Sequence, residues 1–460
     1  MHKKTFKFWA LASVILAPVL TPVPGLAFDA LSVNTMARMF VPETLAQFKT
    51  EKPSMAADDG LDSLKELDIW SRIRNGYAIA DLDDPLVAKH ITWYASRPEY
   101  IARTTARASR YLFHVVQELE KRGMPSELAL LPFIESAFNP QAFSSANAAG
   151  MWQFIPGTGR DFNLKQTMFK DDRRGVIAST DAALTYLQKL YGMFGDWQLA
   201  LAAYNWGEGS VLKAIKKNQS MGKPTDFESL ADLMPVETRN YVPKLQAVKN
   251  IISNPAQYGI SLPLIVNQPY FTAVDKTSDI DLTIAAQLAE LSIDDFRALN
   301  PQFNRPVITG SDQSTQILLP KENAVKFNLN LAQWGHALSS WTTHKITSAR
   351  ERIETLASKF DTTPDLLRQV NNIPQKTLLR AGSTILVPKT SASLNIDITS
   401  EIADNATLLF EADRPANKHS SGHGGGKSHH GSPIALVHSH MARNTPAKAG
   451  KLHKHHRNQD

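Results

Sequence analysis

The amino-acid sequence predicts a mostly α-helical domain followed by two small α+β domains and a disordered tail. Apolar residues recur at helical spacing through the first half of the 460-residue chain, where strand patterns are nearly absent. Two later segments repeat the order strand, helix, helix, strand. The end of the chain is rich in Gly and His and cannot bury a core.

The N-terminus has the pattern of a secretory signal peptide over residues 1–27. Three lysines precede an apolar stretch that begins at Phe8, and Gly25-Leu26-Ala27 offers small residues for cleavage. An uncleaved membrane anchor is the alternative. Prolines interrupt that stretch, however, and it is shorter than the roughly 20 residues that a bilayer requires. We therefore expect Phe28 to be the mature N-terminus and the protein to be exported to the periplasm.

Composition excludes several classes of site. The chain has no cysteine, so we expect no disulfide, no thiolate metal site and no lipid anchor on a cysteine; association with the outer membrane is left open. From Ala412 to Asp460 there are eight Lys or Arg and two Asp, which accounts for the whole formal charge of +6. No basic groove or motif for nucleic acid occurs elsewhere. The tail is interpreted as a cationic arm that contacts anionic polymers, with metal binding by its histidines as the alternative.

The helical part is predicted in two stretches. Residues 28–100 should form helices joined by loops, with helical spacing first visible over Leu61–Ile73. Residues 101–255 should form the main domain. It should begin with one long helix, Tyr100–Arg122, that Gly123 ends, and Ser126 should cap a short helix to about Ser136. Further helices are predicted over Thr180–Phe194, Trp197–Tyr204 and Val236–Ile252.

Two segments, Tyr270–Pro320 and Trp341–Pro388, resemble each other. Each begins with a β-like stretch, continues with two helices and closes with a short strand and a proline. The predicted order is therefore βααβ in both. We place the two small domains and the disordered tail at residues 266–322, 341–390 and 391–460.

A glutamate, Glu135, directly follows the apolar run Leu128–Ile134. If its side chain is partly buried, the pKa rises and the carboxyl can serve as a general acid. The alternative is a glutamate at a helix end that points to water, since charged residues are usually exposed.

Three other segments combine small and polar residues. In Ala148–Ile155, Gly150 would let the backbone approach a ligand closely, and apolar side chains precede Gln153. Tyr204 and Asn205 arrive together at a helix end. The segment Glu237–Val242 begins another helix. Core packing and helix capping are the alternatives for each segment alone.

In this order the four segments resemble the lytic transglycosylases of the goose-lysozyme-like superfamily, over about Ala102–Ile252. That family has a Glu-Ser pair, a Gly-Leu-Met-Gln-type segment, an Ala-Tyr-Asn segment and a Glu-Thr-x-x-Tyr-Val segment. Here Gly150-Met-Trp-Gln153 takes the second place, and Trp206 follows Asn205. With its repeats, the chain is similar to the membrane-bound lytic murein transglycosylase D group, whose lipoprotein members carry a lipid-modified cysteine.

The resemblance implies a lysozyme-like catalytic domain that cleaves the MurNAc-GlcNAc β-1,4 bond of peptidoglycan, for cell-wall remodelling. Glu135 would act as general acid and then as general base. The sugar's own C6 hydroxyl would close a 1,6-anhydro ring, so no water is consumed. The implied substrate-binding and positioning residues are Ser136, Met151, Gln153, Tyr204, Asn205 and Tyr241. No metal or other cofactor is expected, since no motif contains a cluster of metal ligands.

Ordinary glycosidases use two carboxylates, and only one is evident here. Glu237 lies in a motif interpreted as packing, and Asp171 and Asp172 lie in a loop interpreted as solvated. A muramidase that uses water and a wall-binding protein without activity are therefore the rival hypotheses. The two repeats resemble LysM modules, which bind glycans containing N-acetylglucosamine. Their usual Gly-Asp-Thr start is replaced by Thr277-Ser-Asp279 and Thr347-Ser-Ala349, and spacer modules are the alternative.

Overall fold

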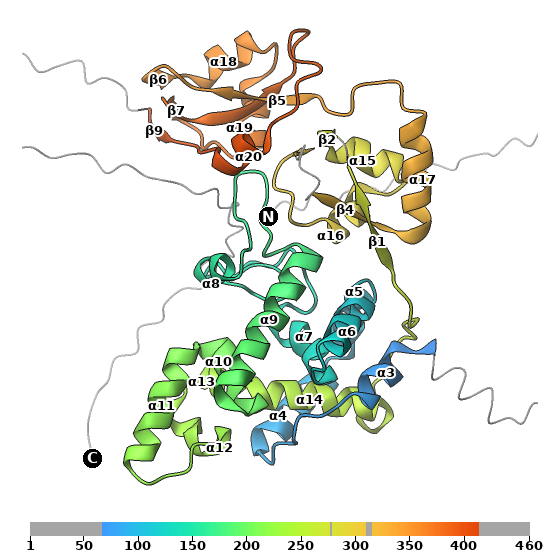
Figure 1. Cartoon of the computed structure of the whole chain (residues 1–460), viewed down its shortest axis with the longest axis vertical. Helices are drawn as coiled ribbons and strands as arrows, with labels where there is room; N and C mark the ends of the chain where they lie inside the picture. Colours follow the sequence, from blue (N-terminus) through green and yellow to red (C-terminus); the bar gives the residue numbers. More distant parts are fainter. Residues whose placement is uncertain (1–66, 277, 310–314, 414–460) are drawn as a thin grey trace, which may run out of the picture. The chain divides into compact units, whose positions relative to one another are not determined.

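The computed structural model describes residues 67–276, 278–309 and 315–413, all within one compact unit, Asp59–Asp460 (Figure 1). The predicted signal peptide and the histidine-rich end of the chain lie outside the described residues. Helices account for the regular structure up to Tyr258, and the named strands follow from Phe271 onward. Within these ranges, no helix combines the length and apolar composition that a membrane span requires.

The N-terminal helices are α3 (Ile69–Asn75), α4 (Pro85–Ala95), α5 (Pro98–Ala108) and α6 (Leu112–Lys121). The prediction of one helix over Tyr100–Arg122 is wrong, because the chain turns between α5 and α6. Tyr111 leaves helical geometry with a φ of −121°, and both Tyr111 and Leu112 are then fully buried. No glycine or proline marks this break, so periodicity alone could not reveal it.

A 3₁₀ turn, η1 (Ser126–Leu130), leads directly into α7 (Leu131–Ser136). Ser126 does not cap a helix as predicted. It lies inside the 3₁₀ turn, and its hydroxyl donates to the carbonyl oxygen of Ile73 at 2.5 Å. Helix α7 ends because Ala137 adopts the left-handed conformation, with a φ of 51°. This ending fixes the place of Glu135 in the last turn of a buried helix.

The remaining helices of this domain follow in the order of the chain. They are α8 (Pro156–Asp161), α9 (Val176–Phe194), α10 (Trp197–Trp206), α11 (Glu208–Ser220), α12 (Phe227–Leu230), η2 (Ala231–Leu233), α13 (Val236–Arg239), α14 (Tyr241–Ser253) and η3 (Pro255–Tyr258). The helix predicted over Val236–Ile252 is therefore two helices, α13 and α14. The junction brings Tyr241 to the first position of α14.

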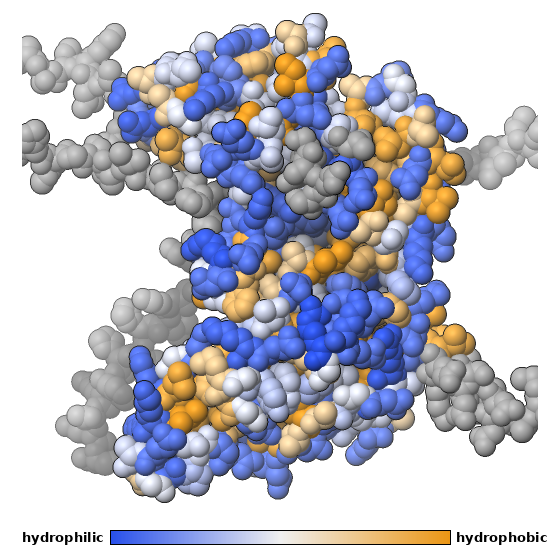
Figure 2. All heavy atoms as spheres, in the orientation of Figure 1, coloured by the Kyte–Doolittle hydropathy of each residue, from blue (hydrophilic) through white to orange (hydrophobic). Residues whose placement is uncertain are grey.

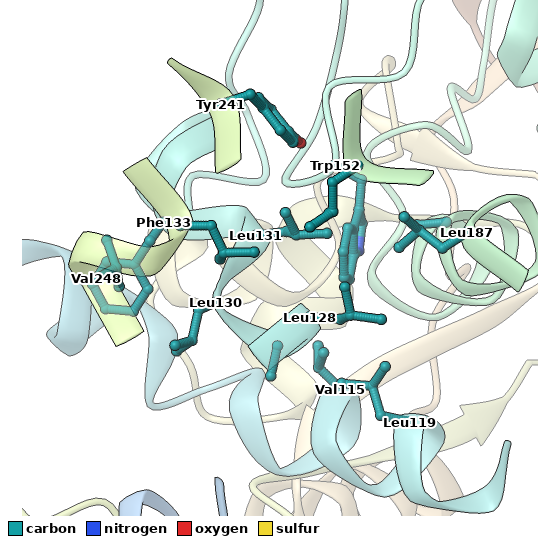
Figure 3. Close-up of a cluster of buried hydrophobic side chains, with 14 of the residues drawn as sticks. Val115, Leu119, Leu128, Leu130, Leu131, Phe133, Trp152, Leu187, Tyr241 and Val248 are labelled. Carbon is teal, nitrogen blue, oxygen red and sulfur yellow. The ribbon is translucent and has the colours of Figure 1, made fainter. Parts of the chain in front are cut away.

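The hydrophobic core surrounds α7 and η1. Figure 3 shows Leu128 and Leu131 of this segment among side chains from α6, α9 and α14, with Trp152 beside them. The core also takes in residues outside 101–255. Trp70 of α3 donates its indole N–H to the carbonyl oxygen of Pro263 at 2.9 Å, and Ile265 is buried. The helical core therefore begins before residue 101 and ends after residue 255.

The first repeat contains β1 (Phe271–Asp275), β2 (Ile280–Asp281), α15 (Leu282–Leu288), α16 (Ile293–Leu299), β3 (Val307–Ile308) and β4 (Gln316–Pro320). The second contains β5 (Trp341–Lys345), β6 (Arg350–Glu351), α18 (Ile353–Lys359), α19 (Pro364–Asn371), β7 (Thr377–Arg380) and β8 (Thr384–Pro388). Helix α17 (Lys321–Ala332) lies between them in sequence. In both repeats the outer strands pair antiparallel, β1 with β4 and β5 with β8, in matching registers.

One buried asparagine in each repeat forms the same pair of hydrogen bonds to the closing strand. The side-chain amide of Asn300 donates to the carbonyl oxygen of Leu318 at 2.8 Å, and its oxygen accepts from the N–H of Leu318 at 2.8 Å. Asn371 makes the same pair of bonds with Leu386, at 2.8 and 2.6 Å. The end of the second helix is thus fastened to the closing strand, which is the physical basis of the repeat seen in the sequence.

The chain remains ordered beyond residue 390. Helix α20 (Ser400–Asn405) and strand β9 (Phe410–Ala412) follow, and β9 pairs antiparallel with β7. Leu408 is buried in the core of the second repeat. The prediction of disorder from residue 391 is therefore wrong for residues 391–413. A few apolar residues at irregular spacing suffice here because they add to a sheet that already exists.

Candidate active site

Glu135 lies next to the last residue of α7 and meets α14. The Tyr241 hydroxyl donates to Oε1 of Glu135. Burial raises the pKa of Glu135 to about 7, although the bond from Tyr241 lowers it. The charge of Glu237 raises this pKa further, and that of Lys244 lowers it. A carboxyl with such a pKa is partly protonated at neutral pH and can both donate and accept a proton.

Ser136 follows Glu135 and supports the neighbouring loop. Its hydroxyl donates to the carbonyl oxygen of Met151 at 3.0 Å. The side chain of Met151 is fully buried in the core. The resemblance implies that Met151 binds substrate, but its buried side chain does not lie on a surface that a substrate could contact. Its backbone carbonyl, rather than its side chain, is the group turned toward Ser136.

Gly150 lets the loop pass close to another part of the same chain. Its φ is +85°, and a Cβ added there would lie 2.0 Å from the carbonyl oxygen of Arg173. The close approach predicted toward a ligand is thus made to Arg173. Gln153, with a φ of 50°, folds its side chain back and donates to the carbonyl oxygen of Gly150 at 2.8 Å.

The two aspartates that follow are not solvated, contrary to the prediction. Asp171 and Asp172 are both buried. Asp171 forms a bidentate ion pair with Arg173, at 3.0 and 2.7 Å. Asp172 pairs with Lys170 at 3.0 Å. Their carboxylates are therefore committed to holding the loop and do not provide a second catalytic acid.

Helix α10 delivers Tyr204 and Asn205 to the same place. Tyr204 donates to the carbonyl oxygen of Trp152 at 2.9 Å. Burial raises the pKa of the Tyr204 phenol well above its ordinary value, and the charge of Glu135 raises it further. Asn205 accepts at its side-chain oxygen from the hydroxyl of Thr238 at 2.7 Å. This leaves the Asn205 amide N–H₂ group without a hydrogen bond to the described residues, since its oxygen alone is engaged.

Five of the predicted site residues lie together in the structure: Glu135, Ser136, Tyr204, Asn205 and Tyr241. Gln153 lies in the adjoining loop, and the side chain of Met151 is buried in the core. Thr238 and Lys244 also belong to the site and were not predicted from the sequence. Thr238 belongs to the segment Glu237–Val242, and its polar position next to Glu237 was the signal available. Glu237 is exposed and acts on Glu135 through its charge, so it does not pack as predicted.

Three family models match the chain. The Transglycosylase SLT domain matches residues 115–227, the lytic transglycosylase MltD LysM-like domain matches 270–335, and the LysM domain matches 351–388. The chain belongs to the lytic murein transglycosylase family, in its D group. The first match includes Glu135, Ser136, Met151, Gln153, Tyr204 and Asn205, whereas Thr238, Tyr241 and Lys244 lie beyond it. The predicted fold class, a mostly α, lysozyme-like domain followed by small α+β modules, is confirmed.

Relatives of the chain include named enzymes. It is 39% identical over 276 residues to the membrane-bound lytic murein transglycosylase D of Escherichia coli (strain K12), covering 60% of each chain. It is 37% identical over 205 residues to a protein of Alteromonas sp. (strain M-1) named for tributyltin chloride resistance, covering 44% of this chain and 91% of that one. The 70 kDa soluble lytic transglycosylase of Escherichia coli matches with a TM-score of 0.24 and 25% identity, covering 29% of this chain and 22% of that one.

Proposed function

We propose that the chain is a peptidoglycan lytic transglycosylase that cleaves the MurNAc-GlcNAc β-1,4 bond and forms 1,6-anhydro-MurNAc. The observation that carries this proposal is a single carboxyl, Glu135, whose burial raises its pKa to about 7 beside the Tyr241 hydroxyl. The matched family models agree with this activity. The protein would serve cell-wall remodelling.

The proposed reaction uses Glu135 twice. The protonated carboxyl first donates its proton to the glycosidic oxygen, while the N-acetyl group of muramic acid assists departure of the leaving sugar. The Glu135 carboxylate then removes a proton from the C6 hydroxyl, whose oxygen attacks C1 and closes the anhydro ring. An intramolecular hydroxyl has the advantage of proximity over bulk water. The two proton transfers return Glu135 to its starting state.

The other site residues position these groups. The amide N–H₂ of Asn205, which makes no hydrogen bond to a described residue, is suited to the carbonyl of an N-acetyl group, because Thr238 already occupies the Asn205 oxygen. Tyr204 and Ser136 fix the loop through the carbonyl oxygens of Trp152 and Met151. We assign Gln153 to the sugar groove, since its side chain is partly exposed in that loop.

The product decides between this proposal and a muramidase that uses water. Digestion of purified sacculi should release fragments that end in 1,6-anhydro-muramic acid, each one water lighter than the fragments released by a lysozyme. Mass spectrometry of the digest is the measurement. Fragments with free reducing ends would instead show that water is the nucleophile. Unchanged sacculi would favour a wall-binding protein without activity.

Tyr241→Phe tests how Glu135 is held. The Tyr241 hydroxyl lowers the pKa of Glu135, so its loss should raise that pKa above about 7. The alkaline limb of the pH–rate profile should move to higher pH, because Glu135 stays protonated longer. The maximal rate should fall by about 10-fold, the effect of one hydrogen bond to a charged group. A lower rate without a shift of the alkaline limb would assign Tyr241 a purely structural role.

The two repeats would keep the enzyme on its substrate. We propose that they bind N-acetylglucosamine in glycan strands, and two weak modules on one chain gain avidity on a polymeric wall. A periplasmic location and contact of the basic tail with anionic wall polymers belong to the same proposal. The outer bounds of the domains and the assignment of residues 1–27 as a signal peptide are also part of this proposal.

A further inference from the structure

The helical domain has a groove that lies apart from the catalytic carboxyl. The groove has a volume of about 650 Å³ and is lined by the turn after α3, the end of α6 and parts of α9 and α10. Trp197, which lines it, is the first residue of α10, and Tyr204 of the candidate active site lies seven positions later. At a rise of about 1.5 Å per residue, roughly 10 Å of helix separates the two. The groove is therefore a separate place on the same domain.

Two aromatic rings in this groove are stacked on each other. The ring centroids of Tyr191 and Trp197 lie 4.3 Å apart, and the ring planes differ by 17°. Tyr191 nevertheless remains 40% exposed, so its exposed surface belongs to its edges and to the face turned away from Trp197. The face of the helical domain that Figure 2 shows is mostly hydrophilic, with small apolar patches. A fixed aromatic pair that is open to solvent in a groove is typical of a binding surface.

Three polar groups on the residues that line the groove make no hydrogen bond to a described residue. They are the hydroxyl of Tyr191, the indole N–H of Trp197 and the side-chain amide of Gln188. All three can donate a hydrogen bond, and the hydroxyl and the amide can also accept one. The groove therefore combines a flat aromatic surface with several hydrogen-bonding groups that the fold does not use.

Gly192 leaves the groove open beside Tyr191. It lies within α9, where glycine is less favourable than any residue except proline. Its backbone is not in the left-handed region, and no atom lies within 4 Å of an added Cβ. Neither the backbone conformation nor the packing of the described residues therefore requires a glycine here. The effect of the missing side chain is to leave space in the groove.

The groove offers no unpaired charge to a ligand. Arg122 is the one charged residue among the described residues that line it. Its guanidinium pairs with Glu118 and with Asp181, both at 2.6 Å. A strongly charged ligand would find no partner of opposite charge here, so the groove suits a neutral one. The C–H groups on one face of a sugar ring pack well on an aromatic face, which carries partial negative charge.

We infer that the groove lined by Gln188, Tyr191, Gly192 and Trp197 binds the neutral sugars of a glycan strand, apart from the bond that is cut. This inference rests on the proposed function, since the proposed substrate is such a strand. A sugar ring would lie on the exposed face of Tyr191, and its hydroxyl or acetamido oxygens would accept from Trp197 and Gln188. A strand held at two places on one enzyme is bound more tightly than at either alone.

Hydroxyl-radical oxidation, followed residue by residue by mass spectrometry, tests the groove locally. The protein is the full chain carrying Glu135→Gln, and the probe is a soluble hexamer of β-1,4-linked N-acetylglucosamine. The hexamer should slow the oxidation of Tyr191 and Trp197. Met193 is the internal control, because it is 41% exposed on the same helix and does not line the groove. Its oxidation should not change. Sugar bound at Glu135 or on the two repeats would not shield the two rings.

Two variants of the same chain test which side chains bind the sugar. Tyr191→Ala should raise the hexamer concentration that half-protects Trp197 by about 3- to 10-fold, the effect of losing one aromatic contact. Gly192→Leu places a side chain in the groove. It should still fold, because an added Cβ meets no atom and leucine favours a helix. In this variant the hexamer should no longer protect Tyr191.

Three results would overturn the inference. They are an absence of protection in the parent chain, equal protection of Met193 and Tyr191, and full protection of Tyr191 in Gly192→Leu. Digestion of sacculi by the chain that retains Glu135 tests the proposed function separately. Protected rings without cleavage would refute the activity and support the groove, whereas cleavage without protected rings would refute the groove and support the activity.

Discussion

Exchanging Glu135 for glutamine should abolish nearly all cleavage of sacculi while the protein still folds and binds glycan. Glutamine has the same shape, and its side-chain oxygen can still accept the hydrogen bond from Tyr241. It cannot donate or remove a proton, however. General acid–base catalysis contributes roughly 10²- to 10⁴-fold, and one group that serves both steps should cost at least the upper part of that range. The rate of release of soluble anhydro-fragments, followed by chromatography and mass spectrometry, measures the loss.

Glu237→Gln is the matched control, because it makes the same chemical change next to the site. Glu237 raises the pKa of Glu135, so its neutralisation should lower that pKa. Activity should then fall at a lower pH than in the unaltered enzyme, but the maximal rate should persist. The reverse result, normal turnover in Glu135→Gln and inactivity in Glu237→Gln, would move the acid to Glu237.

Gly150→Ala should destabilise the catalytic domain by roughly 3 kcal/mol or more. The new Cβ would lie 2.0 Å from the Arg173 carbonyl oxygen and 2.9 Å from its carbon, and the backbone φ of +85° disfavours any side chain. Neither obstacle is the flexible end of a side chain, so the backbone itself must move. For a domain of this size the melting temperature should fall by roughly 6–12 °C. Differential scanning calorimetry of the two proteins measures the shift.

Gly157→Ala provides the comparison for this loss. Gly157 lies in α8, its backbone is not in the left-handed region, and no other atom lies within 4 Å of an added Cβ. Alanine there should be neutral or should stabilise by up to about 1 kcal/mol, because it restricts the unfolded chain. If the two variants have the same melting temperature, the close contact between Gly150 and Arg173 does not fix the conformation of the loop.

Most of the site residues could be predicted from the order of the four motifs in the sequence. Glu135, Tyr204, Asn205 and Tyr241 meet in the structure because their motifs end α7, end α10 and begin α14, and α14 packs against both α7 and α10. The burial of the Met151 side chain could not be predicted in the same way. A methionine in a loop motif is compatible with a groove or with the core, and only the packing around Trp152 places it in the core.

Two errors have a common physical origin. The break between α5 and α6 and the burial of Asp171 both involve contacts with distant parts of the chain. The Tyr111 hydroxyl donates to the carbonyl oxygen of Ala298 at 2.7 Å, and the N–H of Asp171 donates to the carbonyl oxygen of Gln302 at 2.9 Å. The ion-pair partners Arg173 and Lys170 are near in the sequence, but spacing alone does not show that the loop is covered by residues about 130 positions later.

The pairing of β9 with β7 has a consequence for how the second repeat can be isolated. A fragment that stops at the closing proline, Pro388, would lack Phe410–Ala412 and leave the free edge of β7 open. An open strand edge with unpaired N–H and C=O groups is a template for association with other chains. Residues 390–413 therefore protect the module against aggregation, and a soluble fragment of it should extend at least to Asp413.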